Sequence, residues 1–307
     1  MSNNTSKVVI AGGSGFLGRY LAALLRHDGH DVVSLSRTRS DVTQTGVQYV
    51  RWDPTAVGDW TAVLEHADAV VNLCGETISG KRWTDARKAD LLESRCTPSQ
   101  TLVTAINGMT NPPSVYLQAS GVGYYGTGEG VVSENSSPGD DFLARLAGRW
   151  EAPVADVGVR SVLLRFGVVL HATEGALPMM LLPFRVFMGG TLATGRQWLS
   201  WIHILDAVRA MSFVMERSDI EGPVNITAPE PVRNKTFATF AGAALNRPTF
   251  LPTPGFILHW LLGEQAILVT EGQQAHPTIL TQRGFVFRFP KLDKTLENLL
   301  TGSGTDR

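Results

Sequence analysis

Short apolar runs alternate with longer amphipathic segments along the first half of the chain. Six runs rich in Val, Leu and Ile are apolar almost without interruption, as strands buried on both faces of a parallel sheet must be: 7–11, 31–35, 47–51, 69–73, 114–119 and 161–166. The segments between them have the apolar spacing of helices: 16–27, 60–66, 84–107 and 141–157. This alternation predicts right-handed crossovers and an α/β fold with a Rossmann-type doubly wound parallel sheet.

The pattern changes after about residue 171. We expect helices over 175–188, 203–216 and 234–245, a strand over 223–226 and, beyond a proline-rich stretch that begins at Arg247, a final helical stretch to Leu300. The sequence therefore predicts a Rossmann domain over residues 1–171 and a smaller C-terminal α/β lobe over residues 172–300. Some of the later segments are expected to return to the first sheet.

Composition narrows the class of protein. The 307 residues are 43% hydrophobic and 18% charged, and the net charge of −1 gives no basic surface for nucleic acid or an anionic membrane. No apolar run is long enough for a membrane span or a signal peptide. Two cysteines form no disulfide framework, and the seven histidines include no pair at metal-ligand spacing. We expect a cytoplasmic protein without a metal.

Three glycines follow the first predicted strand at GxxGxxG spacing. Gly12 permits a sharp turn, Gly15 lets backbone approach a pyrophosphate, and Gly18 lets the following helix pack closely on the sheet. The anion then meets the N–H groups at a helix N-terminus. The alternative is a glycine-rich turn of another α/β protein, but the strand before and the helix after favour a dinucleotide site at Gly12, Gly13, Ser14, Gly15, Phe16, Leu17 and Gly18.

The end of the second predicted strand indicates which dinucleotide is bound. An NAD site usually has Asp or Glu there, whereas an NADP site has Arg for the 2′-phosphate. Here Ser36 and Arg37 follow the strand, and no acidic residue occurs before Asp41. A hydroxyl and a guanidinium fit a phosphate. NADP is therefore predicted, the alternative being that Arg37 and Arg39 are solvated loop charges.

Nine stretches of the chain resemble one protein family: 12–18, 72–76, 81–83, 94–95, 123–126, 149–151, 182–185, 189–190 and 201–204. The family is the extended and atypical short-chain dehydrogenase/reductases, or NAD-dependent epimerase/dehydratase superfamily. Within it the chain resembles the branch called an epimerase family, in some bacteria cell-division-inhibitor-like. Residues 247–300 resemble the uncharacterised small domain that ends proteins of this branch.

The resemblance implies a Rossmann domain that binds NADP(H) and a C-terminal lobe that closes over a substrate. It also implies the positions of cofactor contacts beyond the glycine turn, with Ser36 and Arg37 at the adenosine phosphate end: Leu73, Cys74 and Gly75 after the fourth strand, Arg95 on the long helix, and Val169 near the nicotinamide. Cys74 is interpreted as a small core residue, so no thiol chemistry is expected.

The resemblance implies catalysis by a Ser/Tyr/Lys arrangement, in which the tyrosine and lysine stand one helical turn apart. The family commonly has a glutamate four residues after the lysine, and Glu151 matches that glutamate. Counting back from it places Ala147 where the lysine is expected and Leu143 where the tyrosine is expected. The pair is missing. The remaining catalytic candidates are Ser120 and either Tyr124 or Tyr125, and the alternative is that the two tyrosines only line the cofactor pocket.

Two main functions follow. The first is an NADP-dependent oxidoreductase or epimerase that acts on a small polar molecule, as a monomer or homodimer. The second is a non-catalytic NADPH sensor or scaffold, motivated by Leu143 and Ala147. An FAD protein is disfavoured, because its fingerprint is usually GxGxxG with an acidic residue after the second strand. Arg185 is as readily a partner in a surface salt bridge as a ligand for an anionic substrate group, whereas His203 and Asp206 resemble residues that are usually structural in the superfamily. Trp198 and Trp201 are expected to pack in the core or between the lobes rather than to contact a ligand.

Overall fold

The computed structural model describes residues 5–301, and its centre is a seven-stranded sheet of parallel strands. The strand order is β11-β7-β5-β4-β1-β2-β3, so the chain starts in the middle and builds outward in both directions. The bounds are β1 (Lys7–Ala11), β2 (Asp31–Ser36), β3 (Gln48–Arg51), β4 (Ala69–Asn72), β5 (Val115–Gly121), β7 (Arg160–Phe166) and β11 (Gly222–Ile226). The predicted doubly wound Rossmann-type sheet is confirmed.

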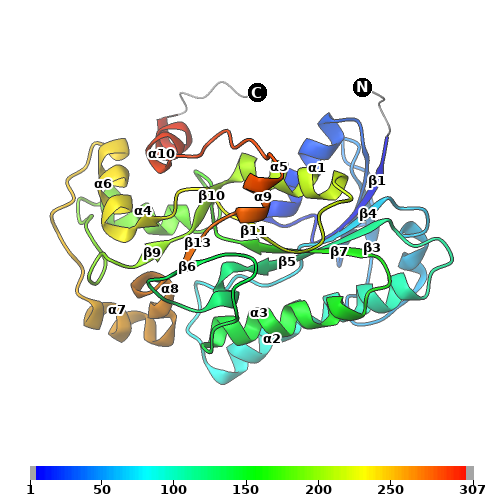
Figure 1. The fold of residues 1–307 in the computed structure, drawn as a ribbon, viewed down its shortest axis with the longest axis horizontal. Coiled ribbons are helices and arrows are strands. Elements are labelled where there is room, and N and C mark those ends of the chain that lie inside the picture. Colours follow the sequence, from blue (N-terminus) through cyan, green and yellow to red (C-terminus); the bar gives the residue numbers. More distant parts are fainter. Residues whose placement is uncertain (1–4, 302–307) are drawn as a thin grey trace.

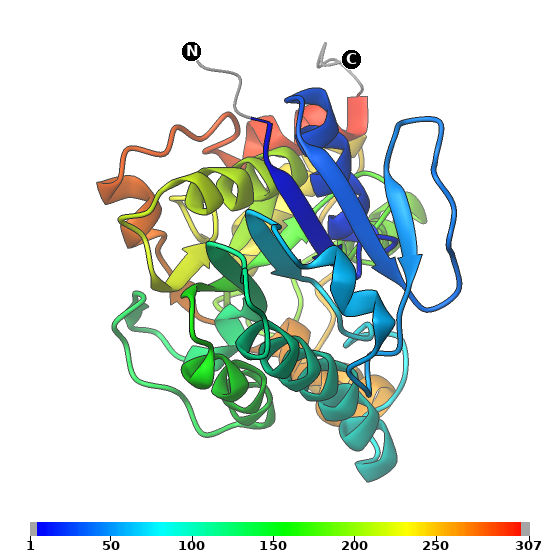
Figure 2. The ribbon, with the colours of Figure 1, turned by 90° about the vertical axis from the view of Figure 1, so that its right-hand side faces the viewer.

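Helices cover both faces of the sheet (Figures 1 and 2). On one face, α1 (Phe16–His27) and α5 (Ile204–Glu216) pack on alternate residues such as Val8 and Ile10 of β1. On the other, α2 (Asp85–Asn107) packs on Val9 and Ala11, and α3 (Phe142–Glu151) lies beside α2. Because successive strand residues point to opposite faces, an unbroken apolar run is what this two-sided burial requires.

A smaller lobe has its own core, formed by α4 (Leu177–Arg185), α6 (Asn234–Leu245) and α10 (Leu292–Thr301) around the fully buried Trp201. Three two-stranded sheets lie outside the main sheet. β8 (Val168–Leu170) pairs with β10 (Trp201–His203), β9 (Trp198–Leu199) with β12 (Val232–Arg233), and β6 (Val131–Val132) with β13 (Gln274–Ala275). β11, although late in the sequence, lies at an edge of the main sheet.

The expected final helical stretch to Leu300 is confirmed only in part, because it is divided into short elements. The chain instead forms α7 (Gly255–Leu262), α8 (Ile267–Thr270), β13, α9 (Thr278–Gln282) and α10. Gly263 ends α7 with a φ of +61°, a left-handed conformation that glycine adopts readily. Pro277 directly precedes α9, where its missing N–H costs no hydrogen bond. The residues between α9 and α10 form no helix.

Three further helices are shorter than predicted by more than one residue. The segment 175–188 is helical only over Leu177–Arg185. The segment 60–66 contains only a 3₁₀ turn, Asp59–Val63, and the segment 141–157 is helical to Glu151 and continues as a 3₁₀ turn over Ala152–Asp156. By contrast, α1 and α6 have the predicted bounds. Within residues 5–301, no helix is both long and apolar enough to cross a membrane.

Candidate functional site

The glycine turn connects β1 to α1 at the carboxyl edge of the sheet, and two of its glycines are needed for the fold. Gly12 has a φ of +80°, and a Cβ there would lie 2.9 Å from the carbonyl carbon of Leu73. A Cβ on Gly18 would lie 2.5 Å from the Cα of Gly13. Both contacts are with backbone, which cannot move aside, so side chains are excluded at these two positions.

Gly15 differs from the other two glycines. A Cβ there would contact only the carbonyl oxygen of Gly12, at 3.2 Å, and its φ is −77°. Gly15 is the N-cap residue of α1 and is exposed, as is Ser14, and no side chain caps the helix. The first-turn N–H groups of α1 therefore point to an uncovered surface, which is the arrangement that binds a pyrophosphate.

The ends of β2 and β4 lie beside this turn. The Ser36 hydroxyl is buried and accepts hydrogen bonds from the backbone N–H groups of Thr38 and Arg39, so it shapes the loop. Arg39 pairs with Asp41 and lies over the Tyr49 ring. Arg37 is exposed and, among the described residues, makes no ion pair. Arg37 is therefore the cation of this loop that can bind a phosphate.

The residues after β4 lie next to the turn. Leu73 contacts Gly12 as described, and the Cys74 N–H donates to Asn72. Burial raises the pKa of the Cys74 thiol to about 12, so it stays protonated, in line with the expectation of no thiol chemistry. Gly75 packs against the buried side chain of Arg95, whose Nη2 donates to the Glu76 carbonyl at 2.7 Å.

Val169 completes the group of predicted cofactor residues. A Cβ on Gly175 would lie 3.3 Å from the Val169 carbonyl oxygen and 3.1 Å from the Phe16 ring, so Val169 and Phe16 lie close together. The structure thus gathers the predicted residues of the turn, β4 and β8 along one edge of the sheet. These residues together form the cofactor edge. It has a space at Gly12 and Gly18 that Cβ atoms would fill and a helix terminus without a cap, and both features fit a dinucleotide.

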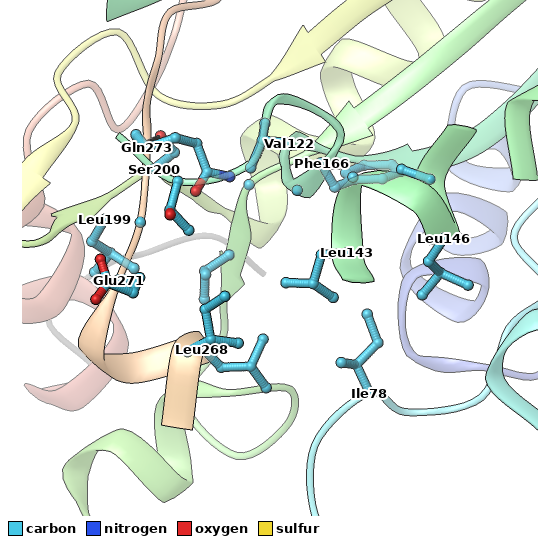
Figure 3. A pocket seen from close by; sticks show the side chains of 18 of the residues that line it. Ile78, Val122, Leu143, Leu146, Phe166, Leu199, Ser200, Leu268, Glu271 and Gln273 are labelled. Atoms are coloured by element: carbon cyan, nitrogen blue, oxygen red, sulfur yellow. Dashed lines mark hydrogen bonds between the residues drawn. The ribbon is translucent and has the colours of Figure 1, made fainter. Parts of the chain in front are cut away.

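A cavity of about 230 Å³ opens at the same edge of the sheet, beyond the ends of β5 and β7 (Figure 3). Leu143 and Ala147 of α3, the positions where tyrosine and lysine were expected, both line it. The wall also includes Ile78 of the loop after β4, Trp198 of β9, and residues 267–268 and 271–273 of the C-terminal segment. Arg95 also lines the cavity, and burial lowers its pKa to about 10, which leaves it charged at neutral pH.

The three catalytic candidates do not line this cavity. Ser120 is buried, and its hydroxyl donates to the Glu151 carboxylate at 2.6 Å. Arg165 of β7 forms two hydrogen bonds to the same carboxylate, at 2.8 and 2.7 Å. Such a bidentate pair, almost entirely removed from water, fixes α3 against the sheet.

The tyrosines belong to the same network. The Tyr125 hydroxyl accepts from Arg165 at 3.0 Å and donates to Asn225 at 2.7 Å, and burial raises its pKa. Tyr124 lies under the Arg165 guanidinium, 3.5 Å from ring centre to charge. These contacts give Ser120, Tyr124 and Tyr125 a structural role. Their assignment as catalytic residues stays a prediction.

Sequence reasoning missed Arg165, although the signal was present. A charged residue inside an otherwise apolar strand needs a buried partner, and Glu151 was already known to lie on the neighbouring helix. Of the two tryptophans considered, Trp198 lines the cavity, whereas Trp201 is buried in the lobe and donates to the Glu230 carbonyl. His203 caps α5, and Asp206 pairs with Arg209, so both are structural.

The sheet order and the glycine turn define a Rossmann-type α/β protein. Residues 8–227 match the NAD dependent epimerase/dehydratase family, and the chain belongs to that family. Residues 253–299 match a domain of unknown function, DUF1731. The resemblance derived from the nine sequence stretches is thereby confirmed, including the uncharacterised C-terminal domain.

The relatives extend over nearly the whole chain. Epimerase family protein YfhF of Bacillus subtilis is 39% identical over 303 residues, which cover 97% of this chain and 99% of the relative. The crystal structure of human epimerase family protein SDR39U1 with NADPH is 35% identical, with a TM-score of 0.88 over 96% of this chain and 99% of the human one. The cofactor predicted here agrees with the one in that crystal structure.

More distant structures share the fold. The UDP-glucose 4-epimerase of Thermotoga maritima, with UDP-glucose, has a TM-score of 0.75 at 13% identity and covers 96% of this chain and 97% of its own. At this level of identity the likeness concerns the fold alone. The substrate of this chain must therefore be inferred from its own cavity.

Proposed function

We propose that this chain binds NADP(H) at the glycine turn and is an oxidoreductase of the short-chain dehydrogenase/reductase type. The observation that carries the proposal is the glycine turn at the exposed, uncapped start of α1, where Gly15 presents backbone and no side chain to the surface. The NADPH in the crystal structure of the human relative supports it. Bound NADPH supplies a hydride.

Each part of the cofactor edge has a role in this proposal. Backbone N–H groups over Gly12–Gly18 bind the pyrophosphate, and Arg37 binds the 2′-phosphate, while Ser36 holds the loop that presents Arg37. The cofactor then extends towards the cavity past Leu73, Cys74, Gly75 and Arg95. Val169 lies near its nicotinamide. The substrate is a small molecule that reaches the cavity beside Leu143. The protein acts in the cytoplasm, as a monomer or homodimer, without nucleic acid or membrane as a partner.

A non-catalytic NADPH sensor or scaffold is the second candidate function. It is favoured by Leu143 and Ala147, neither of which can transfer a proton, and by the hydrogen bonds that engage Ser120 and Tyr125. The two functions share the cofactor and differ in turnover. A measurable rate of NADPH oxidation with any acceptor would exclude the second.

Titration with NADPH, NADH and FAD, followed by calorimetry, tests the binding proposal. We expect a preference for NADPH over NADH that Arg37→Asp removes, with a loss of NADPH affinity of roughly tenfold or more, because a charge-assisted pair is replaced by repulsion. Arg39→Asp is the matched control, since Arg39 already pairs with Asp41, and should cost much less. Equal affinities for NADPH and NADH in the unmodified protein would contradict the proposal.

A further inference from the structure

The cavity has an apolar wall and a narrow polar edge. Figure 3 shows Ile78, Leu143 and Leu268 around a common space, with Ser200, Glu271 and Gln273 together on one side. Further apolar side chains line the cavity, namely Val122, Leu146, Phe166 and Val168, and the rings of Trp150 and Trp198 add two indole N–H groups. A wall of this kind favours a ligand with an apolar body, because it removes apolar surface from water. The expectation of a polar substrate is not supported by this lining.

Charge and size argue against a sugar nucleotide. Among the described residues that line the cavity, Arg95 is the single cation, and Glu271 adds a negative charge. A diphosphate requires several cations or N–H donors to replace its water. The cavity volume of about 230 Å³ is also below the roughly 300–1,000 Å³ of sites that take drug-sized ligands. A ligand of about one ring fits these limits.

The lining also restricts the chemistry of a reduction. An isolated ketone that accepts a hydride becomes an alkoxide, a strong base that needs a proton donor at once. Leu143 and Ala147 stand at the donor positions, and the Tyr125 hydroxyl is held by Arg165 and Asn225. A quinone accepts the same hydride to give a phenolate, whose conjugate acid has a pKa near that of tyrosine, about 10. Such an anion can wait for a proton from water.

We propose that the cavity beside Leu143 and Ala147 takes a small apolar quinone and reduces it with the hydride of NADPH. The inference rests on the proposed NADP(H) binding and specifies the substrate of the same site. A C–H bond of the reduced nicotinamide breaks and an O–H bond forms at one quinone oxygen, so two electrons and one proton leave the nicotinamide. The second quinone oxygen holds the remaining electron pair and takes a proton from water, which completes the hydroquinone. Arg95, the lining cation, stabilises that oxygen while it is charged.

Duroquinone is a suitable probe, because its ring is fully substituted and does not alkylate Cys74 or Cys96. We expect NADPH oxidation with duroquinone above the rate without protein, and none with cyclohexanone, a ring of similar size without conjugation, or with UDP-glucose. Calorimetry of duroquinone binding to the cofactor-free protein gives a readout that does not depend on turnover.

Two variants place a charge in the apolar wall. Leu143→Asp and Leu268→Asp should weaken duroquinone binding roughly tenfold or more, because the carboxylate would have to lose water against an apolar ligand. Leu268 is 38% exposed, so its replacement leaves the fold intact even if that of Leu143 does not. Leu182→Asp, at a leucine 60% exposed on α4, is the matched control and should bind duroquinone as the unmodified protein does.

The outcomes separate the two proposals. If NADPH binds but duroquinone neither binds nor is reduced, or if cyclohexanone or UDP-glucose is turned over instead, the quinone inference is overturned and the cofactor proposal stands. Unchanged duroquinone affinity in both Leu143→Asp and Leu268→Asp would also overturn it. If NADPH does not bind, both proposals fail.

Discussion

The glycine turn and the cavity lie at the same edge of the sheet, but they are built in opposite ways. The turn is one continuous segment whose backbone geometry excludes side chains at Gly12 and Gly18. The cavity is assembled from α3, the loop after β4, β9 and the C-terminal segment, and side chains define its character. A backbone site withstands most side-chain changes, whereas a side-chain site changes its chemistry with one or two replacements. The cofactor can therefore stay the same while the substrate differs.

The largest expected effect breaks the network behind the cavity. Glu151→Ala should lower the free energy of unfolding by about 3–5 kcal/mol, because it leaves the buried Arg165 without its partner. Chemical denaturation measures the loss. Ser120→Ala removes only one hydrogen bond to the same carboxylate and should cost about 1 kcal/mol. If Ser120→Ala instead abolished turnover at unchanged stability, Ser120 would be a catalytic residue rather than a structural one.

A pH titration probes the lobe side of the same edge. Burial lowers the pKa of His203 to about 4, and its Nδ1 accepts the Leu205 N–H at the start of α5. Below pH 6.5 the unfolded chain takes up a proton that the folded chain does not, so stability falls as the pH drops from about 6.5 to about 4. The total is about 3 kcal/mol.

Denaturation at several pH values measures this slope. His203→Gln should flatten it, whereas His27→Gln, at a histidine on the surface of α1, should leave it unchanged. A slope that persists in His203→Gln would assign the acid sensitivity to another group.

The smallest expected effect is on NADPH affinity, and it concerns Gly15 of the glycine turn. Gly15→Ala should reduce NADPH affinity by roughly tenfold, about 1.4 kcal/mol, because a methyl group would stand where the backbone approaches the pyrophosphate. The melting temperature should fall only slightly, because the Gly12 carbonyl oxygen, 3.2 Å from the new Cβ, has to move by a small distance only. Gly148→Ala, at a helical glycine of α3 with open space around it, is the control, and it should raise stability slightly without affecting NADPH. A large loss of stability in Gly15→Ala would show that this glycine serves the fold rather than the cofactor.

Local patterns in the sequence predicted the parts of the molecule that local interactions determine. The strands of the sheet, α1 and α6 follow from apolar periodicity, and the glycine turn from its spacing between a strand and a helix. The C-terminal segment was predicted only coarsely, although glycine and proline at its breaks, Gly263 and Pro277, are local signals for the end and the start of a helix. The absence of the tyrosine–lysine pair was visible from Glu151, but its consequence was not. Only the structure brings Leu143, Trp198 and Leu268 around one space.

The pairing of β6 with β13 has a consequence for how the protein is made. Gly128 donates to the Gly272 carbonyl, and Ser200 binds Gln273 and Ala275, so the last wall of the cavity is held by segments synthesised far earlier. Residues 267–275 leave the ribosome after every other segment of the cavity wall. Until then the apolar lining faces water, and the nascent chain is exposed to aggregation. The apolar wall of the cavity is therefore also a surface that the unfinished chain exposes.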